Sequence, residues 1–351
     1  MKVLALFKLM VEKQASDLFF TSYAPIKIKI AGKIMPVNQL ELTPKMVKQA
    51  VTELMDEAQF KLFSEEKEID FAISKPGLGR FRVNVFMQRG NIAMVLRYIT
   101  MEIPSLDDLG VPPILKDLIM FRRGLVLMVG AAGNGKSTTL AGMINYRNER
   151  TSSHILTVED PIEFLHPNKR SIINQREVGV DTASYASALK SAMRAAPDVI
   201  VIGEIRDRES MQAAIDLAGS GHLVVATLHS NNAPETLDRI INMFPQDQHR
   251  QVYMDLSHYL RAVVSQRLVA GLDGKRVAAV EVMVNTSHIS ELIDRADVSA
   301  VKEAFASSSE QGMQTFDQAL LALYKSGRVS MEEALANADS RTNLEASINF
   351  G

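Results

Sequence analysis

The feature that most constrains this chain is a glycine-rich segment at residues 130–137, which reads GAAGNGKS. The segment fits the phosphate-loop pattern G-x-x-x-x-G-K-[ST] at every fixed position. An apolar run at residues 125–129 predicts a buried strand before it, and a helix is expected to begin near Lys136. A strand, a loop and a helix in this order predict a nucleotide-binding site. The alternative is a glycine-rich turn that binds nothing.

The residue types in this loop suit phosphate chemistry. Glycines allow a tight turn, so that successive backbone N–H groups and the N-terminus of the next helix point at a triphosphate. The ammonium of Lys136 can reach the β- and γ-phosphates, and the hydroxyl of Ser137 suits Mg²⁺. We therefore expect ATP or ADP with Mg²⁺ as cofactors, bound by Gly130, Gly133, Asn134, Gly135, Lys136, Ser137 and Thr138.

Length and composition limit the other possibilities. At 351 residues the chain exceeds what one hydrophobic core usually organises, so two domains are expected. The net charge of −2 gives no global basic footprint for nucleic acid or for an anionic membrane surface. The chain has no cysteine, which removes disulfides and thiolate metal sites. No apolar run approaches the roughly 18 residues that cross a bilayer, so a cytoplasmic protein without membrane insertion is expected.

The pattern of apolar residues divides the chain into four parts. Residues 1–98 predict a small α+β domain. Residues 99–113 contain three prolines and a glycine, a composition typical of an interdomain linker. Strand-like runs alternate with helical patterns over residues 114–286, which predicts an α/β core with a parallel sheet. Residues 287–351 predict a helical C-terminal region.

The first of these parts shows both helical and strand patterns. An amphipathic helix is expected to open the chain, with Leu4, Phe7 and Val11 on one face. Apolar and charged residues alternate at residues 25–30, as in a half-buried strand, and a strand pair is expected over residues 79–98.

Acidic residues follow two predicted strands of the α/β core. Residues 198–204, DVIVIGE, form an apolar strand pattern that ends in the acid Glu204. An acid in this place is expected of the second sequence element of phosphate-loop enzymes, which holds Mg²⁺. An acid after a strand is by itself an unspecific pattern. Another strand, at residues 155–158, leads into Glu159, Asp160 and Glu163. Such a cluster suits metal binding or the orientation and deprotonation of water, and the alternative is a solvated acidic loop.

Two histidines flank a third predicted strand, at residues 223–226. His222 and His229 are seven residues apart, and we consider both as sensors of the γ-phosphate. A single histidine in such a place is more often structural.

The order of these segments resembles the bacterial secretion-type ATPases. GAAGNGKSTT, TVEDPIEF, RAAPDVIVIGEIRD and GSGHLVVATLHSN follow one another like the Walker A, Asp-box, Walker B and His-box motifs of that superfamily. Within it, nearly the whole chain is similar to the PilT/PilU family of twitching-motility ATPases, which retract type IV pili. The resemblance implies a RecA-like P-loop ATPase domain of the α/β class, a small PAS-like N-terminal domain and a helical C-terminal part.

The resemblance also implies roles for single residues. Glu163 matches the Asp-box acid that acts on the attacking water, and Glu204 matches the Walker B acid that holds Mg²⁺ together with Ser137. His222 and His229 match the two His-box positions.

Two arginines match residues of the family's small domain that reach a nucleotide across a subunit boundary. These are Arg82 and Arg97, whose guanidinium groups would stabilise charge on phosphoryl oxygens. The alternative is two surface arginines on the polar face of a hairpin.

The resemblance further implies the partners. Family members are homo-hexamers that turn ATP hydrolysis into mechanical work in the cytoplasm, at the inner face of the cytoplasmic membrane. Their force acts on an inner-membrane pilus platform protein, and no nucleic acid is involved.

Two features place the chain nearer to the PilU-type members. Assembly-type relatives carry a tetracysteine zinc site, and the absence of cysteine favours retraction over extension. Residues 288–293 read HISELI where the PilT pattern is AIRNLI, and the ending GMQTFDQALLALYKSGRVSMEEALANADS is also closer to PilU. PilU-type proteins work alongside a PilT-type motor, so we expect ATP hydrolysis but poor retraction by this chain alone.

Two other functions fit parts of this pattern. The chain could be a nucleotide-binding regulatory subunit whose own hydrolysis is dispensable. It could also be a RecA-like nucleic-acid translocase, although the near-neutral charge and the lack of an aromatic-basic stretch argue against this.

Overall fold

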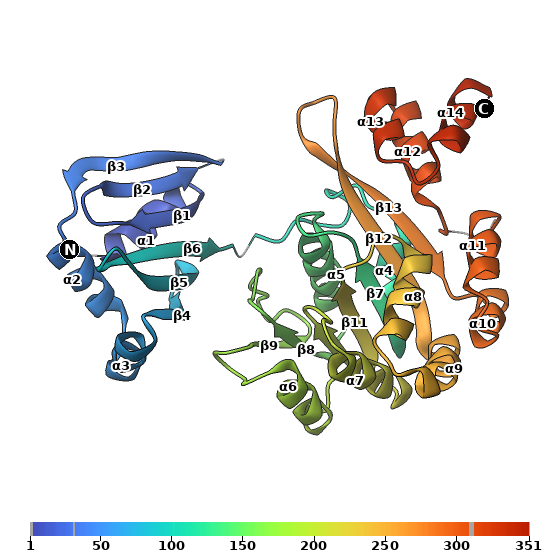
Figure 1. The fold of residues 1–351 in the computed structure, drawn as a ribbon, viewed down its shortest axis with the longest axis horizontal. Coiled ribbons are helices and arrows are strands. Elements are labelled where there is room, and N and C mark those ends of the chain that lie inside the picture. Colours follow the sequence, from blue (N-terminus) through green and yellow to red (C-terminus); the bar gives the residue numbers. More distant parts are fainter. Residues whose placement is uncertain (1–2, 31, 101, 309–311, 351) are drawn as a thin grey trace. The chain divides into compact units, whose positions relative to one another are not determined.

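The computed structural model describes residues 3–30, 32–100, 102–308 and 312–350. It divides the chain into two compact units (Figure 1). The first consists of Met1–Glu102 with Glu163–Leu165, and the second of Ile103–Ile162 with His166–Gly351. The boundary after Glu102 lies within residues 99–113, which the sequence suggests as a linker.

The first unit is an antiparallel sheet whose strands run in the order β3-β2-β1-β6-β5-β4. Three helices cover its apolar face and share one hydrophobic core with it. The elements are α1 (Val3–Glu12), β1 (Ala15–Phe20), β2 (Pro25–Ile30), β3 (Lys33–Glu41), α2 (Pro44–Leu54), α3 (Glu57–Glu66), β4 (Glu68–Lys75), β5 (Gly79–Gln88) and β6 (Asn91–Ile99).

The first helix forms as predicted, but its buried face differs from the predicted one. Phe7 stacks on Phe81 with ring centroids 4.3 Å apart, and this contact fixes the rotation of α1. Val3 and Met10 lie on the same side as Phe7 and are buried, whereas Leu4 is 48% exposed. Apolar spacing alone did not distinguish these two neighbouring faces of the helix.

The second unit is a seven-stranded sheet in the order β13-β12-β7-β11-β10-β8-β9. The four core strands predicted from apolar runs are all present. Every pairing is parallel except that of β12 with β13, so the sheet is mixed at this edge. The strands are β7 (Gly124–Val129), β8 (His154–Glu159), β9 (Ile172–Glu177), β10 (Val199–Ile202), β11 (Leu223–Leu228), β12 (Leu260–Ala270) and β13 (Arg276–Val284).

Helices cover both faces of this sheet, as a doubly covered parallel sheet requires (Figure 1). One core packs α6 to α11 against the strands, and the other packs α4 and α5 against the opposite face. These helices are α4 (Ile114–Leu118), α5 (Lys136–Arg150), α6 (Tyr185–Ala192), α7 (Arg208–Gly219), α8 (Ala233–Asn242), α9 (His249–Tyr259), α10 (Ser287–Asp294) and α11 (Val298–Ala306).

Three further helices pack on the ends of β12 and β13 around Phe316 and Leu320. They are α12 (Phe316–Lys325), α13 (Met331–Ala336) and α14 (Arg341–Phe350). None of the helices in the described part of the chain combines the length and apolar character that a membrane crossing requires.

Candidate functional site

The phosphate loop connects β7 to α5, in the order that the sequence predicts. Gly130, Gly133 and Gly135 all have positive φ angles, of 144°, 79° and 78°. At Gly130 a β-carbon would lie 2.5 Å from the backbone oxygen of Gln266, a residue of the neighbouring strand β12. Glycine is therefore required there by close approach as well as by backbone conformation.

Lys136 begins α5 and folds back over the loop. Its Nζ donates to the carbonyl oxygens of Gly130 at 2.6 Å and Ala131 at 3.0 Å, and the residue is only 9% exposed. Ser137 and Thr138 follow in the first turn of the helix and are half-buried. This turn combines an ammonium, two hydroxyls and the helix N-terminus, a set of groups suited to a phosphate chain.

Gln266 completes the loop, although the phosphate-loop pattern does not include it. Its side chain is 2% exposed, accepts a hydrogen bond from Thr139 Oγ1 at 2.8 Å and donates to the Asn134 carbonyl at 2.8 Å. The sequence signal for it is the polar pair Ser265 and Gln266 within the otherwise apolar part of β12. A buried polar pair on a strand beside a phosphate loop indicates a structural clamp.

Replacing Gln266 with alanine should loosen the loop. The change leaves the buried Thr139 hydroxyl and the Asn134 carbonyl without this partner, which should lower the free energy of unfolding by about 2 to 4 kcal/mol. The affinity for ATP should also fall, because the loop amides are no longer held in place. Urea unfolding and ATP titration measure the two effects. Gln251→Ala on α9, where the side chain is exposed, is the control, and equal behaviour of the two variants would contradict the clamp.

Glu204 follows β10 and lies within an ionic cluster. Its Oε2 accepts hydrogen bonds from Arg206, with Nη2 at 2.7 Å, and its Oε1 lies 2.8 Å from Nε2 of His229. Burial raises the pKa of Glu204, but the hydrogen bond and charge of Arg206, with the charges of His229 and Lys136, outweigh it. The pKa of Glu204 is therefore lowered, and its carboxylate is ionised at neutral pH.

This cluster brings Glu204 and His229 together next to the loop. Gly203 lets the chain after β10 pass close to the end of β8, because a β-carbon there would lie 3.0 Å from Glu159 Cα and 3.0 Å from the Tyr185 hydroxyl. Nη1 of Arg206 also lies 3.7 Å from Oδ2 of Asp160. Arg206 therefore connects Asp160, which follows β8, with Glu204, which follows β10.

His222, the other histidine of the predicted pair, lies at the end of the strands opposite to the loop. His222 precedes β11 and His229 follows it, so one strand of six residues, about 20 Å long, separates them. The backbone oxygen of His222 accepts from Gly124 N at the start of β7, the end opposite to the loop, and its Nδ1 lies near the Ser220 hydroxyl and the Leu217 carbonyl. Within a single chain the two histidines therefore lie at opposite ends of β11, and only His229 lies beside the loop. The role of each as a sensor of the γ-phosphate stays a prediction.

The acids that follow β8 have different surroundings. Glu159 accepts hydrogen bonds from Thr157 and Gln175, with Oε1 2.6 Å and 3.1 Å away, so it points back along the sheet. Glu163 is exposed and lies in Glu163–Leu165, the short segment that groups with the first unit. Its action on the attacking water stays a prediction.

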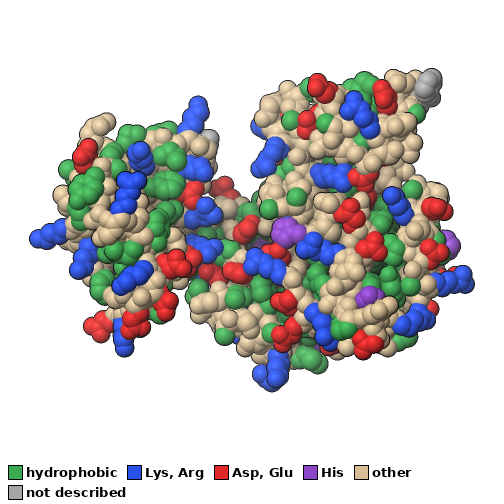
Figure 2. Space-filling model, in the orientation of Figure 1, with side chains coloured by type: hydrophobic (Ala, Val, Ile, Leu, Met, Phe, Trp, Pro, Cys, Tyr) green, Lys and Arg blue, Asp and Glu red, His purple; other side chains and the backbone are tan. Residues whose placement is uncertain are grey.

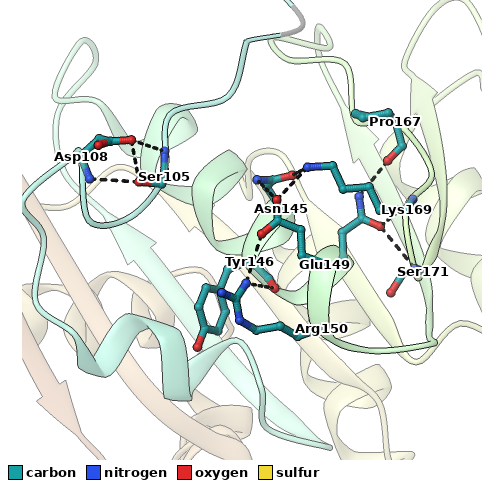
Figure 3. A network of polar contacts seen from close by, with 10 residues as sticks. Ser105, Asp108, Asn145, Tyr146, Glu149, Arg150, Pro167, Lys169 and Ser171 are labelled. Carbon is teal, nitrogen blue, oxygen red and sulfur yellow. Dashed lines mark hydrogen bonds and ion pairs between the residues drawn. The ribbon is translucent and has the colours of Figure 1, made fainter.

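Residues 167–171, which follow this acidic segment, form hydrogen bonds with α5 (Figure 3). Lys169 Nζ donates to Asn145 Oδ1 and Glu149 Oε1, both at 2.8 Å. Asn148 is fully buried and binds the Pro167 carbonyl and the backbone N–H groups of Lys169 and Ser171. The helix that begins at the phosphate loop thus also fixes the segment that leads from the acids into β9.

Glu281 fixes the helix that follows His229. This carboxylate on β13 is 2% exposed and accepts from Ala233 N at 2.8 Å and from Ser265 Oγ at 3.0 Å. Burial raises its pKa to about 7, against the lowering effect of these two hydrogen bonds.

Glu281 should therefore make stability depend on pH. Because its pKa is raised in the folded protein, its contribution is fully present below about pH 4.5 and is lost as the pH rises through 7. Between pH 5 and 8 the wild type should lose on the order of 3 kcal/mol of unfolding free energy relative to Glu281→Gln. Urea unfolding at pH 5, 6, 7 and 8 measures this difference. The exposed Glu209→Gln should show no such trend, and a flat difference for Glu281→Gln would contradict the assignment.

The predicted arginines lie on adjacent strands of the first unit. Arg82 on β5 and Arg97 on β6 are directly opposite each other in the antiparallel register. Together with Asp70, Asn84 and Val95 they line a shallow hollow of about 260 Å³. The sequence alternative, two arginines on the polar face of a hairpin, describes this placement, and their action across a subunit boundary stays a prediction.

Two hollows flank the phosphate loop in the second unit. One, of about 590 Å³, is lined by Ala131, Ala132 and His229 together with residues of α8. The other, of about 340 Å³, lies on the side of Gly135 and Thr138 and extends to Arg276 on β13. The loop therefore has space on both sides for the two ends of a nucleotide.

The donors present suit Mg²⁺ in the predicted manner. Mg²⁺ is usually held by one or two protein oxygens together with phosphates and water. Ser137 offers a hydroxyl in the first turn of α5, and Glu204 offers an ionised carboxylate directly after β10, near enough to Lys136 for its charge to lower the pKa of Glu204. Within the described residues no group of three or more His, Cys, Asp or Glu converges, so phosphate and water would supply the remaining ligands.

Known proteins resemble this chain over nearly its full length. The family model described as type II/IV secretion system protein matches residues 2–336. The chain is 50% identical over 347 residues to the type IV pilus ATPase PilU of Pseudomonas aeruginosa, covering 99% of this chain and 91% of that protein. It is 39% identical over 344 residues to the type IV pilus retraction ATPase PilT of the same organism, covering 98% of this chain and all of that protein (100%).

Solved structures of two known ATPases also resemble the structure of this chain. The crystal structure of the pilus retraction motor PilT with bound ADP superposes with a TM-score of 0.91 at 40% identity, covering 98% of this chain and 99% of that one. The ATPase DotB of Legionella pneumophila superposes with a TM-score of 0.81 at 25% identity, covering 94% of this chain and 92% of that one.

Proposed function

The chain belongs to the family of type II/IV secretion system proteins, and we propose that it acts there as a type IV pilus retraction ATPase, nearer to PilU than to PilT. The RecA-like α/β fold with an N-terminal domain, predicted from the sequence, is confirmed by the PilT and DotB structures. The observation that carries the proposal is that Lys136, Glu204 and His229 lie together beyond the carboxyl ends of the parallel strands. Glu204 contacts His229 there, and the charge of Lys136 lowers the pKa of Glu204.

At this site the chain binds ATP with Mg²⁺ and hydrolyses it. The loop amides and Lys136 would hold the phosphates, and Ser137 and Glu204 would hold Mg²⁺, which would supply positive charge to offset that of the phosphates. His229 marks the γ-phosphate side of the loop, so the base and ribose occupy the opposite hollow beside Thr138 and Arg276. Glu163 orients the attacking water.

The site is completed by a second copy of the chain in a homo-hexameric ring. Arg82 and Arg97 of one subunit approach the phosphates bound by its neighbour, so that hydrolysis depends on the position of the N-terminal unit. Their guanidinium groups suit the charge that develops on phosphoryl oxygens, an effect of about 10³ to 10⁵ in rate in other phosphoryl-transfer enzymes.

The force acts on the inner-membrane pilus platform protein from the cytoplasmic side, alongside a PilT-type motor. No nucleic acid takes part. The face in Figure 2 supports this, because acidic and basic side chains are interspersed over it rather than gathered into a basic stripe.

The test compares pilus retraction in cells that lack this chain, in cells with the wild type and in cells with Glu204→Ala. Loss of retraction force in both mutant strains supports a motor whose own hydrolysis is needed. Full force with Glu204→Ala would instead assign a regulatory role with dispensable hydrolysis. In parallel, phosphate release by the purified protein should not respond to single-stranded DNA at physiological salt, and stimulation would favour a translocase.

A further inference from the structure

Four charged side chains form a row across the first unit's sheet. Asp17 on β1 is directly opposite Arg97 on β6, and Arg97 is directly opposite Arg82 on β5. Residues opposite each other in register present their side chains on the same face. Asp70 on β4 lies two residues before Ala72, the partner of Arg82, and so shares that face. The row therefore reads acid, arginine, arginine, acid.

Each arginine is held by the acid on its outer side. Arg97 Nε donates to Asp17 Oδ1 at 2.8 Å. Arg82 binds Asp70 through Nε at 3.4 Å and Nη2 at 3.2 Å. Like charges directly opposite each other on a sheet repel, so the flanking carboxylates compensate two adjacent guanidinium groups.

The two ion pairs differ in burial. The side chain of Asp17 is 6% exposed, and its Oδ2 also accepts from the Ser16 hydroxyl at 2.9 Å. The side chain of Asp70 is 48% exposed. A buried carboxylate constrains its partner strongly, whereas an exposed pair is weakened by solvent.

The contact with Asp17 leaves the two terminal guanidinium nitrogens of Arg97 accessible. The carboxylate engages Nε, on the stem side of the guanidinium, and the Arg97 side chain is 66% exposed. An arginine fixed at Nε keeps its two terminal nitrogens for a second anion, and their planar geometry suits phosphate oxygens.

We propose that Asp17 is a positioning residue for ATP turnover: it holds the Arg97 guanidinium in the orientation needed at a neighbouring subunit's phosphates. The inference rests on the proposed function, in which Arg97 acts across a subunit boundary. Asp17 itself touches no nucleotide. Its contribution is to restrict a long side chain before it meets the phosphates, so that less rotamer entropy is lost at that moment.

Asp17→Asn should therefore lower kcat roughly tenfold, since ordering one arginine costs about that factor, with little change in KM for ATP. Asp70→Asn is the matched control, because it removes the same charge from the exposed pair, and its kcat should stay within about twofold of wild type. Thermal unfolding of both variants reports whether the fold is retained. A retained fold with wild-type kcat for Asp17→Asn would overturn the inference.

Mixed rings separate positioning from a structural defect. Asp17→Asn subunits keep an intact phosphate loop, and Lys136→Ala subunits keep an intact Asp17 and Arg97. If Asp17 and Arg97 serve a neighbour's site, rings mixed from the two variants should exceed the summed activities of the separate variants. A defect confined to the folding of the Asp17→Asn subunit would give no such recovery.

A second mixture, of Arg82→Ala subunits with Lys136→Ala subunits, distinguishes this inference from the proposed function. Arg82→Ala is suitable, because its partner Asp70 is half exposed and tolerates the loss. Recovery with Arg82→Ala but not with Asp17→Asn would overturn the role of Asp17 and leave the trans site standing. No recovery with either variant, in rings shown to be mixed, would overturn the trans site itself.

Discussion

Replacing Lys136 with alanine is expected to abolish ATP turnover, with a fall of at least about 10² to 10³ in kcat/KM, the usual effect of removing a preorganised charged donor. Two consequences of the structure combine here. The nucleotide loses the ammonium that lies over the loop, and the carbonyls of Gly130 and Ala131 lose the group to which they are bound. Glu204 also loses a nearby positive charge that lowers its pKa.

Phosphate release and ATP titration of the purified protein measure this effect. Lys190→Ala, on the exposed side of α6, removes the same charge from the same unit and should retain wild-type activity. Lys136→Arg should rescue little, because a planar guanidinium cannot replace a compact ammonium between two carbonyl oxygens. Substantial turnover by Lys136→Ala would mean that ATP is hydrolysed elsewhere on the chain.

The sequence predicted those parts of the site that are encoded locally. The phosphate loop, its strand and the start of α5 lie within one short stretch, so spacing alone identified them. Glu204 was also accessible, because an acid at the end of an apolar strand is a local pattern. The core strands were found for the same reason, since strands buried on both faces give short apolar runs.

Features that depend on distant contacts were missed. Gln266 contacts the loop across more than a hundred residues of sequence. The polar pair Ser265 and Gln266 marks a buried polar position on the strand, but it does not indicate which distant segment that position contacts. β3 was missed because it lies at a sheet edge with eight of its nine residues exposed, so no apolar alternation marks it. His222 shows the converse limit: a motif places it beside His229 in the sequence, and an intervening strand separates them in space.

Gly130→Ala should disrupt the phosphate loop more severely than any other single methyl addition within it. The added β-carbon would meet the Gln266 carbonyl at 2.5 Å, and that oxygen belongs to β12, whose pairing with β7 and β13 prevents it from moving aside. A φ of 144° is also a conformation that residues with side chains rarely adopt. We expect a loss of about 3 kcal/mol or more in unfolding free energy and at least 100-fold weaker ATP binding.

Gly133→Ala is the matched control, because it adds the same methyl group three residues along the loop. A β-carbon at Gly133 would meet no atom within 4 Å, and its φ of 79° lies near the left-handed region that side chains can enter at about 1 to 2 kcal/mol. Gly133→Ala should thus keep measurable ATP binding while Gly130→Ala does not, in urea unfolding and ATP titration of both variants. Equal losses would show that strain in the backbone, rather than contact with β12, determines which glycines the loop requires. The predicted difference in ATP binding between Gly130→Ala and Gly133→Ala follows only if β12, the strand that carries Gln266, forms one wall of the nucleotide site. The phosphate-loop pattern does not contain this feature.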